Sequence, residues 1–305
     1  MNRNNFLKFL AIGYPLLLSG ELSRLYSEEK SMNQRIIPST GEKLNPVGLG
    51  TYIKFDVEPD EVNLSKLQKL MEAFIQNGGS IIDSSPMYGN SEKILGLLSE
   101  RIPLLKKHFL ATKVWTSGKE SGISQMTHSL QLLNRNEIEL MQIHNLVDFK
   151  SHLKTLYDWK ERGRIKYIGI THYLDSAHDR LIDILKPESI DFVQFNYSIG
   201  DRNAEKRLLP FCRDNKIATI INEPFEKGSL FRSVKGKALP EIARDYGIST
   251  WAQYFLKYIL SHPAVTCVIP ATSKVNHLLE NLEAGKGNYP GEAEKKEMLK
   301  ILNQK

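Results

Sequence analysis

The sequence predicts a (β/α)8 barrel, a ring of parallel strands surrounded by helices. Eight short apolar or β-branched runs recur along the chain, and amphipathic stretches with helical spacing separate most of them. Strands that are apolar along their whole length and alternate with helices are typical of a parallel sheet buried on both faces. Eight such units in roughly 270 residues match the size of this barrel, whose active sites lie at the carboxyl ends of the strands.

The eight predicted strands share a short length and a high content of Val, Ile, Leu, Phe and Tyr. They cover residues 46–51, 80–85, 109–114, 140–145, 167–172, 192–197, 218–223 and 267–272. The helices predicted between them cover residues 62–76, 91–99, 123–133, 151–162, 175–185 and 205–215. The gap between the last two strands is longer than the others, and we expect a long loop there together with helices over 239–246 and 250–260.

The chain before the first strand has two parts. We expect the barrel domain to occupy residues 36–305 and an N-terminal extension to occupy residues 1–35. Polar and turn-forming residues at Ser39-Thr40-Gly41-Glu42, flanked by short apolar stretches, predict a small hairpin. This hairpin is placed to cover the floor of the barrel.

The extension resembles an export signal. Its start is polar and basic, and the apolar stretch 9–18 is too short to span a bilayer but suits the core of a secretory signal. Arg3-Asn4-Asn5-Phe6-Leu7-Lys8 is similar to a twin-arginine signal, with Asn4 where the second arginine belongs. We expect export to the periplasm through this degenerate signal. The alternative is an uncleaved extension of a cytoplasmic protein, because no clean A-x-A cleavage site follows.

Composition argues against several classes of protein. The net charge of +6 comes from lysines scattered over helical faces and the C-terminal tail, a pattern that does not indicate nucleic-acid binding. No apolar run is long enough for a stable membrane span. The eight histidines include no closely spaced pair on a strand, so no metal site is predicted. Cys212 and Cys267 lack metal-ligand spacing, and we expect both to be buried free thiols. Nothing in the pattern determines the oligomeric state.

Four residues that can hold or move a proton follow three successive predicted strands. Asp83 and Tyr88 share the loop after the second strand, Lys113 ends the third, and His144 ends the fourth. Because the carboxyl ends of parallel strands meet at one rim, we expect these side chains to converge. Each alone has an ordinary structural explanation, such as a turn cap, a packed ring, a solvated charge or a core histidine. Their recurrence at one rim favours a catalytic role.

These residue types suit the reduction of a carbonyl group. A tyrosine normally keeps its proton until about pH 10, and we expect the ammonium of Lys113 to lower the pKa of Tyr88. Asp83 would keep Lys113 charged, and a neutral His144 could donate a hydrogen bond to an oxygen that becomes an alkoxide. The four residues lack a reductant, so the reaction requires hydride from a bound nicotinamide.

Two other functions remain open at this stage. Lys113 could form a Schiff base with the substrate of a barrel lyase or isomerase. The barrel could instead be a non-catalytic regulatory protein that senses a nucleotide. Gly48-Leu49-Gly50 does not indicate a Rossmann domain, because the third glycine and the following helix are missing.

At these residues the sequence resembles the aldo-keto reductase family. Residues 78–92, GGSIIDSSPMYGNSE, are similar to the signature G-x-x-x-x-D-T-A-x-x-Y-G-x-S-E. Further segments match in order, namely 111–113, 142–144, 163–170, 269–273 and 280–281, and the resemblance extends from residue 36 to residue 285. It implies a barrel that uses NADPH to reduce a small carbonyl substrate. Tyr88 would be the general acid, Asp83 and Lys113 would tune it, and His144 would orient the carbonyl.

The resemblance also implies cofactor contacts from strand ends and two loops. These are Gly50, Thr51, Thr171, His172, Gln194, Asn222, Pro224, Phe225, Gly228, Pro270, Thr272, Ser273, Lys274, His277 and Asn281. Thr171-His172 replaces the usual Ser-Asn pair, and Asn222 replaces a tyrosine that often stacks on the nicotinamide. Ala271 and His277 stand where a lysine and an arginine often hold the 2′-phosphate. We expect NADPH, with NADH as the open alternative.

The substrate itself cannot be read from these motifs, because specificity depends on loops. Candidate rim residues are Tyr52, Phe55, Trp115, Asn145 and Phe149. They suggest an aromatic-lined pocket, and the alternative is that they only pack the loops.

Overall fold

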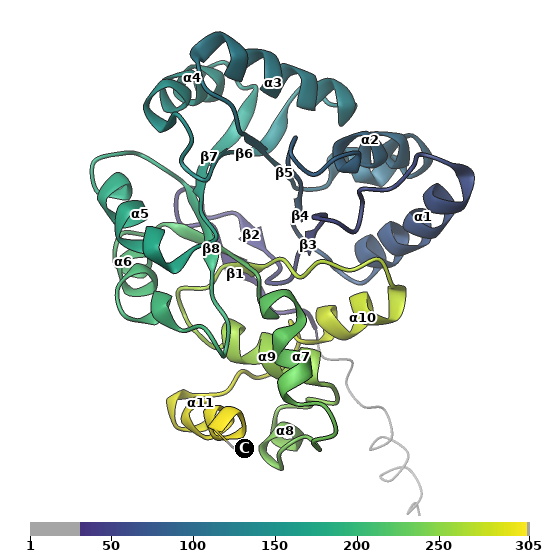
Figure 1. Ribbon diagram of the computed structural model, residues 1–305, viewed down its shortest axis with the longest axis vertical. Coiled ribbons are helices and arrows are strands. Elements are labelled where there is room, and N and C mark those ends of the chain that lie inside the picture. The colour runs from purple at the N-terminus through teal and green to yellow at the C-terminus, as the bar shows by residue number, and fades with distance from the viewer. Residues whose placement is uncertain (1–30, 304–305) are drawn as a thin grey trace, which may run out of the picture. The chain divides into compact units, whose positions relative to one another are not determined.

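The computed structural model describes residues 31–303, and its centre is an eight-stranded parallel sheet (Figure 1). The strands are β3 (Leu49–Gly50), β4 (Ile82–Asp83), β5 (Leu110–Val114), β6 (Ile138–His144), β7 (Ile165–Thr171), β8 (Phe192–Asn196), β9 (Ala218–Asn222) and β10 (Cys267–Val268). They are hydrogen-bonded in chain order from β3 to β10. Parallel bridges from Val47 to Val268 and from Gly50 to Ala271 join the first strand to the last. The fold is therefore the predicted (β/α)8 barrel.

Helices surround the strands (Figure 1). The α-helices are α1 (Glu61–Gln76), α2 (Ser91–Arg101), α3 (Lys119–Leu132), α4 (Phe149–Glu161), α5 (His178–Leu185), α6 (Leu208–Asp214), α7 (Ser229–Ser233), α8 (Ile242–Asp245), α9 (Trp251–Leu260), α10 (Val275–Glu283) and α11 (Glu292–Met298). Short 3-10 helices are η2 (Pro103–Lys107), η3 (Asp175–Ala177), η4 (Asn203–Glu205), η5 (Glu226–Gly228) and η6 (Leu299–Asn303).

Each predicted strand overlaps an observed strand, and each predicted helix overlaps an observed helix. The sequence analysis did not anticipate α7, α10 and α11. α7 has only five residues, too few to show a helical period. α10 follows Lys274, which makes no side-chain capping hydrogen bond, so the usual N-terminal signal of a helix is missing. α10 matters for function because it carries part of the predicted cofactor segment.

The floor of the barrel is closed by an antiparallel hairpin, β1 (Arg35–Ile36) and β2 (Lys43–Leu44), as predicted. Leu44 packs into the apolar cluster inside the barrel, which includes Tyr167 at the amino end of β7. Glu42 accepts hydrogen bonds from the Tyr167 hydroxyl at 2.5 Å and from the Lys166 ammonium at 2.6 Å. The hairpin covers the amino ends of the strands, and in this fold active sites lie at the opposite, carboxyl ends.

The last residues of the expected N-terminal extension, 1–35, already make hydrogen bonds to the barrel domain. The Asn33 side-chain amide donates to the Gly287 carbonyl at 2.7 Å, and the Arg35 guanidinium donates to the Leu260 carbonyl at 2.6 Å. The predicted export signal lies in residues 1–30, outside the described residues, and it stays a prediction. Within residues 31–303, no helix is long and apolar enough to cross a membrane.

The two cysteines are buried and free, as predicted. Burial raises the pKa of the Cys267 thiol to about 12 and also raises the pKa of the Cys212 thiol. Thiols held in the protonated form are poor nucleophiles, so neither cysteine is suited to catalysis.

Candidate active site

The parallel register of β4, β5 and β6 brings Asp83, Lys113 and His144 to one rim of the barrel. Asp83 lies opposite Ala111 on β5, and Lys113 lies opposite Gln142 on β6. Tyr88 reaches the same point from the turn after β4, where its backbone amide donates to the Ser85 carbonyl at 3.0 Å. Four side chains from three neighbouring strand ends thus form a single cluster.

Lys113 and Asp83 form an ion pair inside the barrel. The Lys113 side chain is fully buried, and its Nζ lies 2.6 Å from Asp83 Oδ2 and 2.7 Å from the Ser84 carbonyl oxygen. Burial disfavours the ammonium, but attraction to Asp83 and to Tyr88 outweighs burial and raises the pKa of Lys113. Lys113 is therefore a fixed positive charge at neutral pH.

Two amide side chains complete the coordination of Asp83. Gln142 and Gln194 each donate a hydrogen bond to Asp83 Oδ1 at 2.9 Å. Gln194 also donates to Gln142 Oε1 at 3.3 Å, which links the two amides. With both carboxylate oxygens bonded, Asp83 has one orientation, and Lys113 is held in place by it.

Tyr88 lies directly above this ion pair. The centre of its ring is 4.9 Å from Lys113 Nζ, and the rings of His144 and Tyr52 lie 5.9 Å and 5.0 Å away. Burial raises the pKa of Tyr88, the Lys113 ammonium lowers it, and the net change is upward. The prediction of a lowered pKa was therefore wrong in its net direction, because the desolvation of the hydroxyl outweighs the attraction of the ammonium.

His144 is neutral at physiological pH. Burial, together with the positive charge of Lys113 and the nearby His172, lowers the pKa of His144 to about 3. Its Nδ1 lies 3.1 Å from the Ser85 hydroxyl oxygen. When Ser85 donates this hydrogen bond, the imidazole proton is on Nε2, and that nitrogen is the donor.

Two members of the cluster were missed by the sequence analysis. Gln142 lies two residues before His144 on β6, so both face the barrel interior, and this alternation was the available signal. Glu92 is buried on α2 and accepts hydrogen bonds from the Thr112 and Ser129 hydroxyls. Burial raises the pKa of Glu92, which lies behind the strand that carries Lys113. The available signal was the family signature over 78–92, which ends at Glu92, although helical spacing alone does not distinguish Glu92 from an exposed glutamate.

Three of the predicted cofactor residues belong to the same buried network. Thr51, which follows Gly50 at the end of β3, donates to Ser84 Oγ at 3.0 Å and is close to the Asp83 carbonyl. Thr171 Oγ1 donates to Gln194 Oε1 at 3.3 Å. The predicted cofactor residues on β3, β7 and β8 therefore border the catalytic cluster directly.

His172 and Asn222 lie further around the rim. Nδ1 of His172 accepts a hydrogen bond from the Leu174 amide at 3.2 Å, and its ring stacks on Tyr173 with the centroids 5.7 Å apart. Asn222, at the end of β9, has a buried Oδ1 with no hydrogen-bond partner among the described residues. A buried acceptor of this kind is a site for a donor from a ligand.

The loop after β9 begins with Pro224 and Phe225 and continues into η5. The ring centre of Phe225 lies 4.9 Å from that of Phe231 and 6.5 Å from that of Phe255. Gly228 has a φ of 88°, a left-handed conformation that favours glycine, and it is the residue directly before the short helix α7.

The segment after β10 carries the remaining predicted cofactor residues. Pro270 and Thr272 are buried, and Thr272 Oγ1 accepts a hydrogen bond from the Lys274 amide at 3.1 Å. Lys274 and His277 are exposed at the start of α10, while Asn281 is buried on its inner face. Ser273 and Lys274 also line a cavity of about 590 Å³ with Ser65, Lys66 and Lys69 of α1.

The predicted aromatic lining is only partly at the rim. Tyr52 and Trp115 are 50% and 42% exposed, whereas Phe55 is 0% exposed and belongs to the apolar core. Phe149 is half-buried against the same core, and Asn145 Oδ1 is buried without a partner among residues 31–303. For Phe55, burial in the core favours the alternative that it packs the loop and does not line the pocket.

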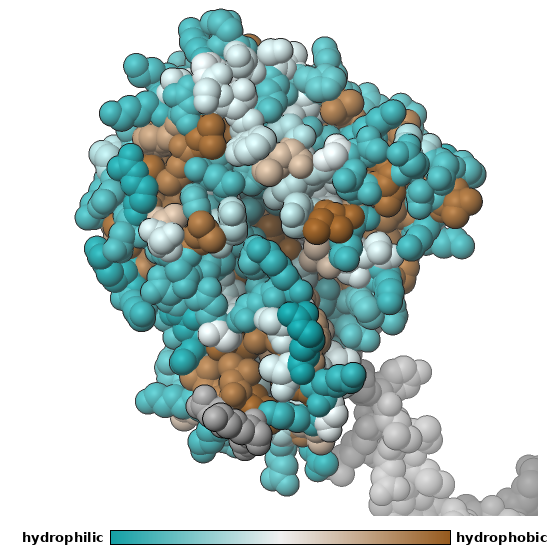
Figure 2. Space-filling view, viewed as in Figure 1, coloured by the Kyte–Doolittle hydropathy of each residue, from teal (hydrophilic) through white to brown (hydrophobic). Residues whose placement is uncertain are grey.

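Exposed hydrophobic side chains are common on the loops at the carboxyl ends of the strands. They are Tyr52, Ile53, Met87, Trp115, Tyr173 and Leu174. Figure 2 shows a largely hydrophilic face with hydrophobic residues scattered around its centre. The mouth of the barrel therefore offers apolar contacts above a buried polar cluster, a combination typical of a small-molecule site.

Comparison with known proteins identifies the family. Residues 46–296 match the model of the aldo/keto reductase family. The chain belongs to this family. Among curated relatives, it is 27% identical over 260 residues to the methylglyoxal reductase YeaE of Escherichia coli, covering 82% of this chain and 89% of the relative. An NADH-specific methylglyoxal reductase of the same organism is 29% identical over 252 residues, covering 72% and 76%.

Solved structures agree with the fold. The aldo/keto reductase from Klebsiella pneumoniae in complex with NADP and acetate superposes with a TM-score of 0.74 at 20% identity. The match covers 88% of this chain and 94% of the other. At this level of identity the likeness establishes the (β/α)8 barrel, and the chain is an oxidoreductase of the aldo-keto reductase type by its family.

Proposed function

We propose that this protein reduces the carbonyl group of a small aldehyde or ketone to an alcohol with NADPH, and that Tyr88 donates the proton. The observation that carries the proposal is the position of Tyr88 between a permanently charged lysine and a neutral histidine. Its ring centre lies 4.9 Å from Lys113 Nζ and 5.9 Å from the centre of the His144 ring.

Tyr88 is suited to give up its proton only during the reaction. Burial keeps its pKa above the ordinary value, so the hydroxyl is protonated at neutral pH. When the proton leaves, the phenolate forms beside the Lys113 ammonium, and their attraction stabilises it. Asp83, Gln142 and Gln194 keep that ammonium in place. Because the charge is already in position, little reorganisation is needed at the moment of transfer.

His144 is proposed to orient the carbonyl. Its neutral imidazole can donate from Nε2 to the carbonyl oxygen while Ser85 holds Nδ1 at 3.1 Å. The low pKa of His144, about 3, means that this role does not depend on pH in the physiological range. Tyr88 then protonates the oxygen that His144 polarises.

The residues around the cluster fit a nicotinamide cofactor. The buried Oδ1 of Asn222, which has no hydrogen-bond partner among residues 31–303, can accept a hydrogen bond from the carboxamide, and Thr171 and His172 lie two strands away at the end of β7. When bound, the reduced nicotinamide supplies the hydride that adds to the carbonyl carbon. At the other end of the site, Ser273, Lys274 and His277 would hold the 2′-phosphate and Asn281 the adenine end. A lysine, a serine and a histidine would replace the two parallel hydrogen bonds that an arginine makes.

The relatives suggest which carbonyls to test first. The Escherichia coli and Bacillus subtilis relatives are a methylglyoxal reductase and a glyoxal reductase, and we propose small 2-oxoaldehydes as substrates of this chain. The exposed rings of Tyr52 and Trp115 provide apolar walls at the mouth, and the polar groups of the buried cluster lie beneath them.

Substitution of Tyr88 by Phe tests the proposal. We expect Tyr88→Phe to abolish NADPH oxidation with methylglyoxal while NADPH still quenches the protein fluorescence with nearly unchanged affinity. Tyr52→Phe is the matched control, because it removes a hydroxyl from the neighbouring ring and should retain most activity. Wild-type turnover by Tyr88→Phe would refute the assignment of the proton donor. If NADH and not NADPH binds to the wild-type protein, the cofactor assignment is wrong.

The Schiff-base alternative is disfavoured by the state of Lys113. An imine requires a neutral amine that a substrate can reach. Lys113 is fully buried and paired with Asp83, and its pKa is raised, so its amine is charged and enclosed. Borohydride trapping of a substrate adduct at Lys113 would support the alternative. A different result would support a nucleotide-sensing role: the protein binds NADPH, but none of the carbonyl compounds tested leads to NADPH oxidation.

A further inference from the structure

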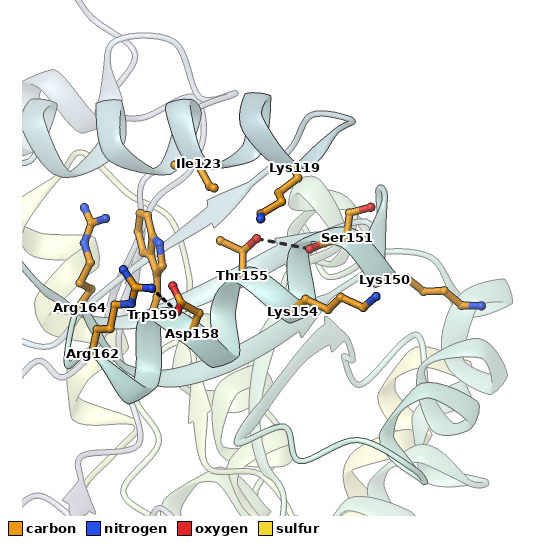
Figure 3. Close-up of a pocket in the computed structure, with 10 residues that line it drawn as sticks. All are labelled: Lys119, Ile123, Lys150, Ser151, Lys154, Thr155, Asp158, Trp159, Arg162 and Arg164. Carbon is orange, nitrogen blue, oxygen red and sulfur yellow. Dashed lines mark hydrogen bonds and ion pairs between the residues drawn. The ribbon is translucent and has the colours of Figure 1, made fainter.

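A second concave site lies on the outer wall of the barrel, between α3 and α4 (Figure 3). Its volume is about 670 Å³, and it is lined by Lys119, Ile123, Lys150, Ser151, Lys154, Thr155, Asp158, Trp159, Arg162 and Arg164. None of these residues belongs to the catalytic cluster or to the predicted cofactor positions. The groove is therefore separate from the active site.

The groove has a strong excess of positive charge. Five of the lining side chains are cationic and one, Asp158, is a carboxylate. Asp158 is bonded to Arg162 at 2.7 Å. Lys119, Lys150 and Lys154 form no ion pair with any residue between 31 and 303. The chain brings these like charges together without supplying their counterions, which costs free energy unless an anion is bound.

The charges lie at both ends of the groove. Figure 3 shows the arginines at one end and the lysines at the other, with Thr155 and Ile123 between them. α4 has 13 residues, which corresponds to a length of about 20 Å. A single phosphate would contact only one end, so the spacing fits an elongated anion that carries more than one charged group.

The local structure at the lysine end also favours an anion. α3 begins at Lys119 and α4 at Phe149, so the N-termini of two long helices meet there. The Gly118 amide donates to Asp148 Oδ2 at 2.7 Å, which fixes the two helix starts relative to each other. The Ser151 hydroxyl donates to Asp148 Oδ1 at 2.8 Å and the Thr155 hydroxyl donates to the Ser151 carbonyl at 3.4 Å, so the lysine side chains are the donors for an anion at this end.

The arginine end offers a fixed guanidinium. Arg164 stacks on the ring of Trp159, with Cζ 3.8 Å from the ring centre, and this contact orients the guanidinium plane. Arg164 forms no ion pair with the described part of the chain. A planar guanidinium with free donors is well suited to a phosphate, which it can bind through two parallel hydrogen bonds.

We propose that this groove binds a small anion with two or more phosphate groups. A protein partner is less suited, because the lining holds only two hydrophobic residues and one of them, Trp159, is buried under Arg164. A stable protein interface usually has an apolar or aromatic centre, which this groove lacks. A double helix of nucleic acid needs an extended basic surface rather than one concave site.

The test is calorimetric titration of the full-length protein with inorganic tripolyphosphate, with sulfate at matched ionic strength as the comparison anion. We expect one saturable site per chain, with tighter binding of tripolyphosphate than of sulfate. The double variant Lys150→Ala/Lys154→Ala should weaken binding at least tenfold. Both lysines are exposed, and the helix content of this variant, measured by circular dichroism, should match that of the wild type.

Two controls separate this groove from general attraction and from the proposed cofactor site. Lys106→Ala/Lys107→Ala removes the same charge from two exposed lysines on η2 and should change affinity less than twofold. Lys274→Ala should also have little effect, because it lies at the start of α10. The proposal would be overturned if the Lys150/Lys154 and Lys106/Lys107 double variants lost tripolyphosphate affinity equally. It would also be overturned if only Lys274→Ala lost affinity, or if the titration did not saturate. Tighter binding of an acidic peptide or duplex DNA than of tripolyphosphate would overturn the assigned ligand class.

Discussion

The two halves of the proposed active site differ in how much of their structure the chain supplies by itself. Around Lys113 and Asp83, each charged atom is buried and bonded to another residue of the barrel. Around Lys274 and His277, the side chains are exposed at the start of a surface helix. The comparison teaches that the proton-handling half is held by contacts within the barrel, whereas the proposed phosphate-binding half is exposed to solvent.

The largest effect is expected from removing the buried ammonium. Lys113→Met leaves Asp83 buried with an uncompensated charge, which should lower the free energy of unfolding by about 3–5 kcal/mol. Activity should fall by about 10² to 10³-fold or more, because the charge that stabilises a Tyr88 phenolate is gone. Urea unfolding and steady-state kinetics measure the two effects.

A double variant separates stability from chemistry. Lys113→Met/Asp83→Asn removes both charges and should recover most of the lost stability while activity remains lost. A single variant as stable as the wild type would show that the ion pair is less desolvated than the structure indicates.

A smaller effect is expected from the amides that hold Asp83. Gln142→Leu removes one hydrogen bond to a buried carboxylate and should cost about 1–3 kcal/mol in unfolding free energy. Gln194→Leu removes the equivalent bond and also the partner of Thr171, so it should raise the KM for the cofactor as well. If Gln142→Leu and Gln194→Leu have the same KM for the cofactor, Gln194 acts only on Asp83 and does not affect cofactor binding.

The pH dependence of stability tests the neutral state of His144. Its pKa is about 3 in the folded protein, whereas an unfolded histidine has a pKa of about 6.5. Below pH 6.5 the unfolded chain binds the proton more readily, so the free energy of unfolding should fall as the pH drops towards 3. In His144→Gln the fall in unfolding free energy between pH 6.5 and pH 3 that His144 causes should disappear. His128→Gln, at an exposed position on α3, should leave that fall unchanged. An unaltered slope in His144→Gln would contradict the assigned state.

The smallest effect is expected in the exposed half. Lys274→Ala should raise the KM for NADPH by about tenfold or less, through the loss of one contact with the 2′-phosphate. The KM for NADH should not change, and the free energy of unfolding should stay within about 0.5 kcal/mol. Equal increases for both cofactors would mean that Lys274 contacts a part that they share, such as the pyrophosphate.

Sequence patterns predicted the barrel and the convergence of four side chains for a simple reason. In a parallel barrel, the position of a residue relative to its strand determines which end of the barrel it occupies. Asp83, Lys113 and His144 all end strands, so one-dimensional order was sufficient to place them. The position of Phe55 could not be predicted in this way, because an aromatic side chain on a loop can point to solvent or into the core. α10 was missed because a helix of nine residues without a side-chain cap has a weak local signal.

The sequence by itself determined the number of strands, the closure of the floor by a hairpin and the side chains that share the rim. Only the tertiary structure decided how these side chains are charged and held. The raised pKa of Tyr88 and the aim of Gln142 and Gln194 at one carboxylate oxygen depend on burial and on distances between different strands. Desolvation and Coulomb energies are sums over all neighbours in space, and a linear pattern does not contain those neighbours.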